Sequence, residues 1–106
     1  MKTITIEEYK AELADLATQI SQRFEKQIRV DVENASLWLR TETCHGHVGL
    51  AFTSGKSSMI SKAEFSRGSA LSGPIDEVMR GLCEYQIVHD ALVLAVLRFA
   101  NTEITG

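Results

Sequence analysis

The sequence predicts an α+β fold, a small antiparallel sheet of three or four strands flanked by an N-terminal helix and a long C-terminal helix. Apolar residues recur at three- and four-residue steps near both ends of the chain, which is the spacing of one helix face. Between 28 and 53 they alternate with polar residues, as in half-buried strands. The expected order is α-β-β-β-(β)-α. The length of 106 residues fits one domain spanning residues 1–106.

The first predicted helix runs from about Ile6 to Gln27. Thr5 and Glu8 have the spacing of a capping box, which begins a helix by satisfying two free backbone N–H groups. One face of this helix is apolar and would pack against the sheet; it comprises Ile6, Tyr9, Leu13, Leu16, Ile20 and Phe24.

Three strands are predicted next, at 28–33, 36–43 and 48–53. Turns at 34–35 and 44–47 would fold them into a meander with its apolar side chains on one face. The predicted register pairs Val32 with Leu37, Val30 with Leu39, and Leu39 with Phe52. Residues 57–66 stay open between a fourth strand from Met59 to Phe65, a short helix and a loop.

The second predicted helix begins at Pro74 and is terminated by Asn101, and its second half, 87–100, has no clear polar face. A helix that is apolar all round must be covered all round, and a short chain has little protein with which to cover it. This half has about 14 residues, fewer than the roughly 20 uncharged residues that a membrane span needs, so it is predicted to be a buried helix rather than a membrane helix. We therefore expect a homodimer, whose predicted interface is His89, Leu92, Val93, Val96 and Phe99.

Composition excludes several classes of protein. The net charge of −3 disfavours general affinity for nucleic acid, which needs a basic face. Two cysteines are too few for a disulfide scaffold, and no secretory signal is visible near Met1. The expected location is the cytoplasm.

No motif predicts catalysis or a cofactor. Cys83 and His89 would lie about 240° apart on one helix, so they could not join Cys44, His45 and His47 around one zinc ion. The 44–47 segment is therefore predicted to be a hairpin turn. The run 54–58, Ser-Gly-Lys-Ser-Ser, lacks the first glycine of a phosphate-binding loop. Adjacent helical positions point about 100° apart, so His89 and Asp90 are not expected to form a dyad.

The outer face of the predicted sheet is the better candidate site. The register places Trp38 there, beside Asp31 and near Arg29 and Arg40. Trp and Arg are enriched among the residues that dominate protein–protein binding energy. Two alternatives stay open: the terminal helix or the 53–73 segment covers Trp38, or the indole stacks on a nucleobase.

The 53–73 segment is locally basic, because it contains three basic residues, Lys56, Lys62 and Arg67, and only one acidic residue, Glu64. It would serve either as a contact for an acidic partner or a phosphate backbone, or simply as a solvated loop.

These observations predict a small non-enzymatic protein-binding module, of the inhibitor, adaptor or chaperone type, that docks on a larger protein as a homodimer. Small acidic viral or mobile-element proteins that block host enzymes share this profile. The order of helix, meander and helix resembles that of small secretion chaperones, which implies no role for any residue. The alternative is a nucleic-acid-binding regulator that uses Trp38, Arg29, Arg40 and the 56–67 segment.

Overall fold

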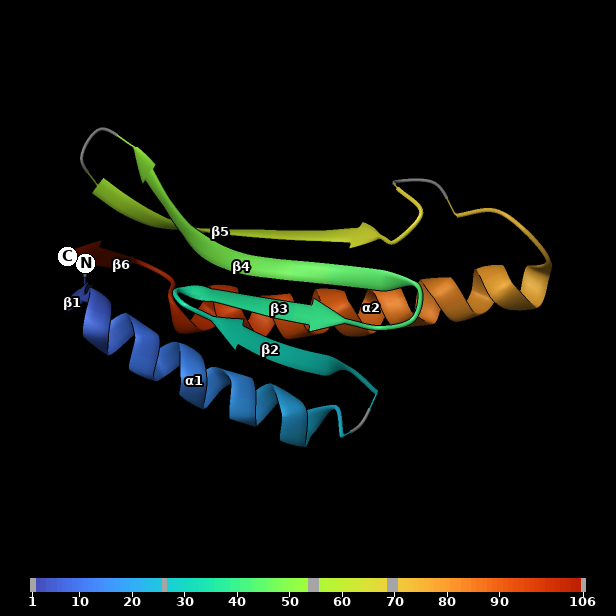
Figure 1. The fold of residues 1–106 in the computed structure, drawn as a ribbon, viewed down its shortest axis with the longest axis horizontal. Helices are drawn as coiled ribbons and strands as arrows, with labels where there is room; N and C mark the ends of the chain where they lie inside the picture. Colours follow the sequence, from blue (N-terminus) through green and yellow to red (C-terminus); the bar gives the residue numbers. More distant parts are fainter. Residues whose placement is uncertain (1, 26, 54–55, 69–70, 106) are drawn as a thin grey trace.

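The computed structural model describes residues 2–25, 27–53, 56–68 and 71–105, and Figure 1 shows their arrangement. The elements are β1 (Lys2–Thr5), α1 (Ile6–Arg23), β2 (Arg29–Glu33), β3 (Ser36–Arg40), β4 (Cys44–Thr53), β5 (Lys56–Phe65), α2 (Ile75–Arg98) and β6 (Thr102–Thr105). The strands form one sheet in the order β1-β6-β5-β4-β3-β2. The predicted α+β class is confirmed, with an antiparallel meander between an N-terminal helix and a long C-terminal helix.

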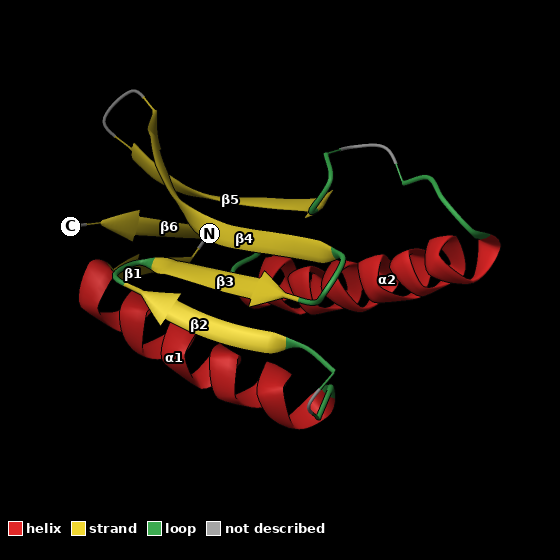
Figure 2. Cartoon of the chain, turned by 45° about the vertical axis from the view of Figure 1, so that its right-hand side comes forward, coloured by secondary structure: helices red, strands yellow, loops and turns green. Residues whose placement is uncertain are grey.

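Both helices pack on the same face of the sheet, α1 against β2 and β3, and α2 against β4 and β5 (Figure 2). The two helices meet near the end of α2, where the Phe99 ring lies 5.1 Å from the Tyr9 ring. Arg98 also donates to Asp15 of α1 at 3.1 Å. The molecule therefore has two layers, and no described helix covers the opposite face of the sheet.

Helix α1 begins as predicted and ends earlier. The Thr5 hydroxyl accepts from the Glu8 N–H, and the Glu8 carboxylate accepts from the Thr5 N–H, both at 3.1 Å. The predicted end at Gln27 is wrong, because the helix ends at Arg23. Glu25 has a φ of 53°, a left-handed conformation that cannot continue a right-handed helix.

The β2–β3 register is confirmed, but the next pairing is not. Val30 pairs with Leu39, and Val32 with Leu37. Leu39 pairs with Gly46 rather than Phe52, because the chain turns at 41–43 and the predicted 44–47 turn is instead the start of β4. The Thr41 hydroxyl stabilises this turn by accepting from the Cys44 N–H at 3.0 Å.

Gly46 faces α2 at the closest approach of helix and sheet. A Cβ atom there would lie 2.7 Å from Cγ1 of Val88 and 3.3 Å from Cδ1 of Leu92. The glycine therefore serves close packing rather than a turn.

All but the last residue of the segment left open, 57–66, lie within β5, which forms a long hairpin with β4. Two further strands, β1 and β6, were not predicted; they form a parallel pair of four residues each. Each contributes one buried side chain, Ile4 or Ile104, so neither contains an alternating pattern. Asn101, with a φ of 53°, separates α2 from β6 and is the terminator that was expected. Within the described ranges, no helix is long and apolar enough to cross a bilayer.

Tyr9 connects α1 to the β2–β3 turn and to the end of α2, and its burial should make the stability of the fold depend on pH. Its side chain is fully buried, its hydroxyl donates to the Ala35 carbonyl at 3.0 Å, and burial raises its pKa to about 12. An unfolded tyrosine ionises near pH 10, so this contribution to stability is present below pH 10 and lost as the pH rises to about 12. The loss should reach roughly 2–3 kcal/mol. Urea unfolding at pH 9 and 11.5 measures it. Tyr9→Phe should be less stable than the wild type at pH 9 but should lose less stability between pH 9 and pH 11.5. An equal loss in both proteins would show that the Tyr9 hydroxyl is not the titrating group.

Candidate functional site

The open face of the sheet brings together polar and aromatic side chains from four strands. One cross-strand row contains Asp31, Trp38, His47 and Lys62, and the neighbouring row contains Arg29, Arg40, His45 and Glu64. Alternation places all eight on the side away from the helices. We call these eight residues the outer-face cluster.

Trp38 lies near the middle of this cluster. Its ring centroid is 4.3 Å from that of His47, at a tilt of 43°, and the Arg40 guanidinium lies 5.4 Å from the ring. The ring is half-buried by these neighbours in the sheet. The alternative that the terminal helix covers Trp38 is wrong, because α2 packs on the opposite face.

Two carboxylates divide the charges of the cluster into two groups. Asp31 forms ion pairs with Arg29 at 3.1 Å and with Arg40 at 3.3 Å. At the β5 end of the same face, Glu64 pairs with Lys62 at 2.6 Å and with His45 at 3.3 Å. The face is therefore mixed in charge, with fixed cationic and anionic positions around one aromatic ring.

These surroundings shift the pKa values of two groups in the cluster, Glu64 and His47. The hydrogen bond from Lys62 lowers the pKa of Glu64, and His45 lowers it further. Partial burial lowers the pKa of His47, which favours a neutral imidazole against the indole at pH 7.

The prediction of four outer-face residues agrees with the geometry: Trp38, Asp31, Arg29 and Arg40 lie together. His45 and His47 were missed because 44–47 was assigned to a turn, and Glu64 was missed because 57–66 was not assigned to a strand. The alternation of Cys44, Gly46 and Val48 with two histidines was the signal that could have found them.

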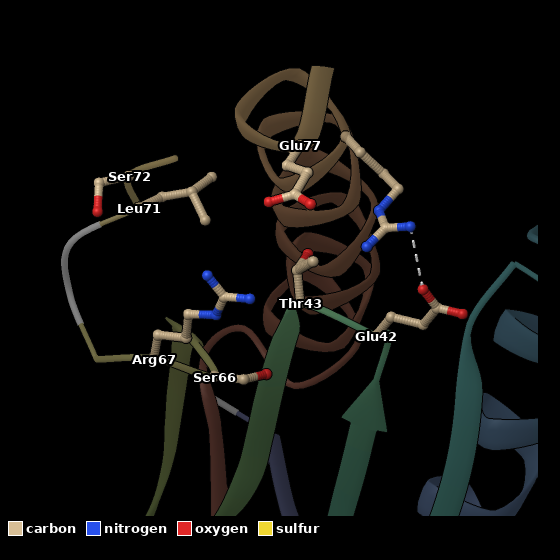
Figure 3. A pocket seen from close by; sticks show the side chains of 8 residues that line it. Glu42, Thr43, Ser66, Arg67, Leu71, Ser72 and Glu77 are labelled. Carbon is tan, nitrogen blue, oxygen red and sulfur yellow. Dashed lines mark ion pairs between the residues drawn. The ribbon is translucent and has the colours of Figure 1, made fainter. Parts of the chain in front are cut away.

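The predicted basic segment is not one surface. Lys62 lies on the outer face and pairs with Glu64. Arg67 follows β5 and points into a cavity of about 200 Å³ at the start of α2, shown in Figure 3. Glu77 faces the same cavity, and Arg80 pairs with Glu42 across its rim at 3.3 Å. The side chain of Lys56 is outside the described part of the structure.

The predicted interface on α2 needs correction. Leu92 and Phe99 are 7% and 4% exposed and belong to the core of one copy, where Leu92 faces Gly46 and Phe99 contacts Tyr9. His89, Val93 and Val96 remain exposed. They border a shallow apolar groove of about 320 Å³ between α2 and β5.

The remaining chemical groups are dispersed. Cys44 is buried on the helix-facing side with its thiol 3.6 Å from the Gly81 carbonyl, whereas His45 and His47 lie on the opposite face. His89 and Asp90, which were not expected to form a dyad, lie close at the exposed surface, where Nδ1 of His89 is 3.4 Å from Oδ1 of Asp90. The same oxygen also accepts from the Gln86 amide at 2.7 Å. In the described ranges no group of three metal-ligating side chains could hold an ion.

The loop before β4 is held by a carboxylate from α2. Glu84 accepts from the N–H of Thr43 at 3.0 Å and from its hydroxyl at 2.8 Å. Partial burial raises the pKa of Glu84, but the hydrogen bonds from Thr43 and Thr41 and the charge of Arg80 outweigh it, so the pKa is lowered overall. The carboxylate therefore fixes the end of the outer-face cluster to α2 without exposing a reactive group.

Comparison of the chain with protein-family models, with curated proteins and with solved structures gives no match.

Proposed function

We propose that the chain is a small non-enzymatic protein-binding module that docks on a larger protein through the outer-face cluster. The observation that carries this proposal is Trp38, held between His47 and Arg40 on a sheet face that no helix in the described ranges covers. A tryptophan ordered by its neighbours loses little conformational entropy on binding, while its ring still offers a large contact area.

The charges around Trp38 favour a protein partner. Asp31 neutralises part of the charge of Arg29 and Arg40, and Glu64 does the same for Lys62 and His45. A partner with complementary positive and negative groups can match such a face, and this complementarity gives specificity. A nucleic-acid regulator, the alternative, would need a surplus of cations along one surface. The separation of Lys62 from Arg67 argues against such a surface.

The proposed module acts in the cytoplasm as a homodimer. Cys44 and Cys83 are free thiols, as is usual in a reducing compartment. The exposed side chains of His89, Val93 and Val96 support self-association through α2.

Replacing Trp38 with alanine tests the docking surface. Proteins captured by the wild-type chain from the source cell are identified, and the affinity of each is measured by calorimetry with purified components. Trp38→Ala should lower the affinity for the specific partner by about 30-fold or more, which corresponds to the loss of a binding hot spot of about 2 kcal/mol. Circular dichroism should show a retained fold, because the ring is only half-buried.

Gln22→Ala provides the control, because Gln22 is exposed on α1, away from the cluster. It should bind the partner like the wild type. Equal affinity of Trp38→Ala and wild type would overturn the docking proposal. Salt-sensitive binding of random duplex DNA that Trp38→Ala abolishes would favour the nucleic-acid alternative instead.

A further inference from the structure

The solvent-facing side of α2 exposes large apolar side chains along its length. Ile75 is 81% exposed, Met79 55%, Leu82 51%, Val93 40% and Val96 42%. With Leu97 they expose on the order of 600 Å² in total, in two apolar stretches on either side of Gln86 and His89, and clustered apolar exposure of this kind marks interaction sites. The first turns of α2 also extend beyond the end of the sheet (Figure 1).

The spacing of these side chains is that of a coiled-coil seam. Positions 75, 79 and 82 are separated by four and three residues, and 93 and 96 continue the same alternation. Gln86 and His89 occupy the two positions in between. A repeat of alternating fours and threes is the pattern by which one helix packs against another along a narrow stripe. We call these seven residues the α2 seam.

We infer that the α2 seam packs antiparallel against the α2 seam of a second copy, with Gln86 opposite the partner's His89. This inference rests on the homodimer of the proposed function and adds its direction and register. The two-fold axis passes midway between positions 86 and 89, so Leu82 lies opposite the partner's Val93 and Met79 opposite the partner's Val96. Every large apolar residue of the seam except Ile75, at its end, then packs against a large apolar residue of the partner.

The polar centre favours a second copy and this direction. Gln86 donates to Asp90 of its own helix at 2.7 Å, and His89 Nδ1 lies 3.4 Å from the same oxygen. The Gln86 amide keeps a second N–H and its oxygen, and His89 keeps Nε2, so Gln86 and the partner's His89 can hydrogen-bond across the axis twice in the antiparallel pair. A partner with a wholly apolar seam would leave the remaining amide groups of Gln86 and the Nε2 atom of His89 without hydrogen bonds in the contact, which costs stability. A parallel pair would instead bring His89 against His89.

The helix ends favour the same direction. Asp76 and Glu77 lie in the first turn of α2, and Arg98 lies in its last turn. A parallel pair would place two acidic first turns side by side. The antiparallel pair separates them and opposes the two helix dipoles.

The dimer has a consequence for docking. Each α2 packs on its own sheet on one side and meets the partner on the other, so the layers are sheet, helix, helix and sheet. The two outer-face clusters then point away from each other. The dimer is bivalent and can hold two partner molecules or two sites of one large assembly.

The oligomeric state tests the seam. Light scattering coupled to gel filtration at about 50 μM should show a dimer for the wild type. Leu82→Glu should shift the mass to that of a monomer. Ile60→Glu is the matched control, because Ile60 is 48% exposed on the outer face and Leu82 51% on the seam. It should remain dimeric, and circular dichroism checks that both variants fold.

Cysteine cross-linking tests the direction. In a Cys83→Ser background, the pair Leu82→Cys with Val93→Cys should give a covalent dimer on mild oxidation. Leu82→Cys alone should not, because the two copies of residue 82 would be about 16 Å apart along the axis. Cross-linking of the single variant would overturn the antiparallel register and leave the homodimer intact. A monomeric wild type would overturn the whole inference, while the partner affinity of Trp38→Ala would still decide the docking proposal.

Discussion

Replacing Gly46 with valine is expected to destabilise the fold by about 3 kcal/mol or more. The new Cβ would lie 2.7 Å from Cγ1 of Val88 and 3.3 Å from Cδ1 of Leu92, both on the buried side of α2. Val88 has no exposed surface, and a β-branched side chain has few rotamers into which it can retreat. The helix would therefore have to move away from β4. The midpoint of urea unfolding, measured with its slope, gives the change in free energy.

A double-mutant cycle identifies the cause of this loss. Val88→Ala alone should cost stability because it leaves a cavity, but in the Gly46→Val background it should restore part of what was lost. Gly46→Ala should fall between wild type and Gly46→Val. Strictly additive losses would show that the contact with Val88 is not responsible.

Gly46 also shows where sequence patterns are insufficient. Both helices and the β2–β3 hairpin were predictable, because caps and apolar spacing are local signals. A glycine between two histidines resembles a turn, and what makes it a strand residue is a helix more than 40 positions away. The pair β1 and β6 joins opposite ends of the chain through one buried side chain each, so no local window contains its signal.

The candidate site divides in the same way. Trp38, Asp31, Arg29 and Arg40 lie on two strands with a short connection, so a correct hairpin register places all four. The histidines of β4 depend on the register between β3 and β4, which the misplaced turn shifted. On α2, apolar spacing alone does not tell which apolar residues face the sheet, and for that reason Leu92 and Phe99 were assigned to the interface.

Val48→Ala is expected to cost about 2–3 kcal/mol, whereas the same change at Val32 should cost less than about 1 kcal/mol. Both valines belong to one row across the sheet, on either side of Leu37, and both were predicted on the inner face. Val48 lies in a central strand with no exposed surface, but Val32 is 42% exposed because β2 is the edge strand. Removing two methyl groups leaves a cavity only where neighbours enclose the site on all sides. Thermal and urea unfolding of the two variants compare burial directly, since residue type and substitution are the same. Similar losses at both positions would mean that β2 is covered in solution, as expected if a partner chain or a second copy adds to that edge.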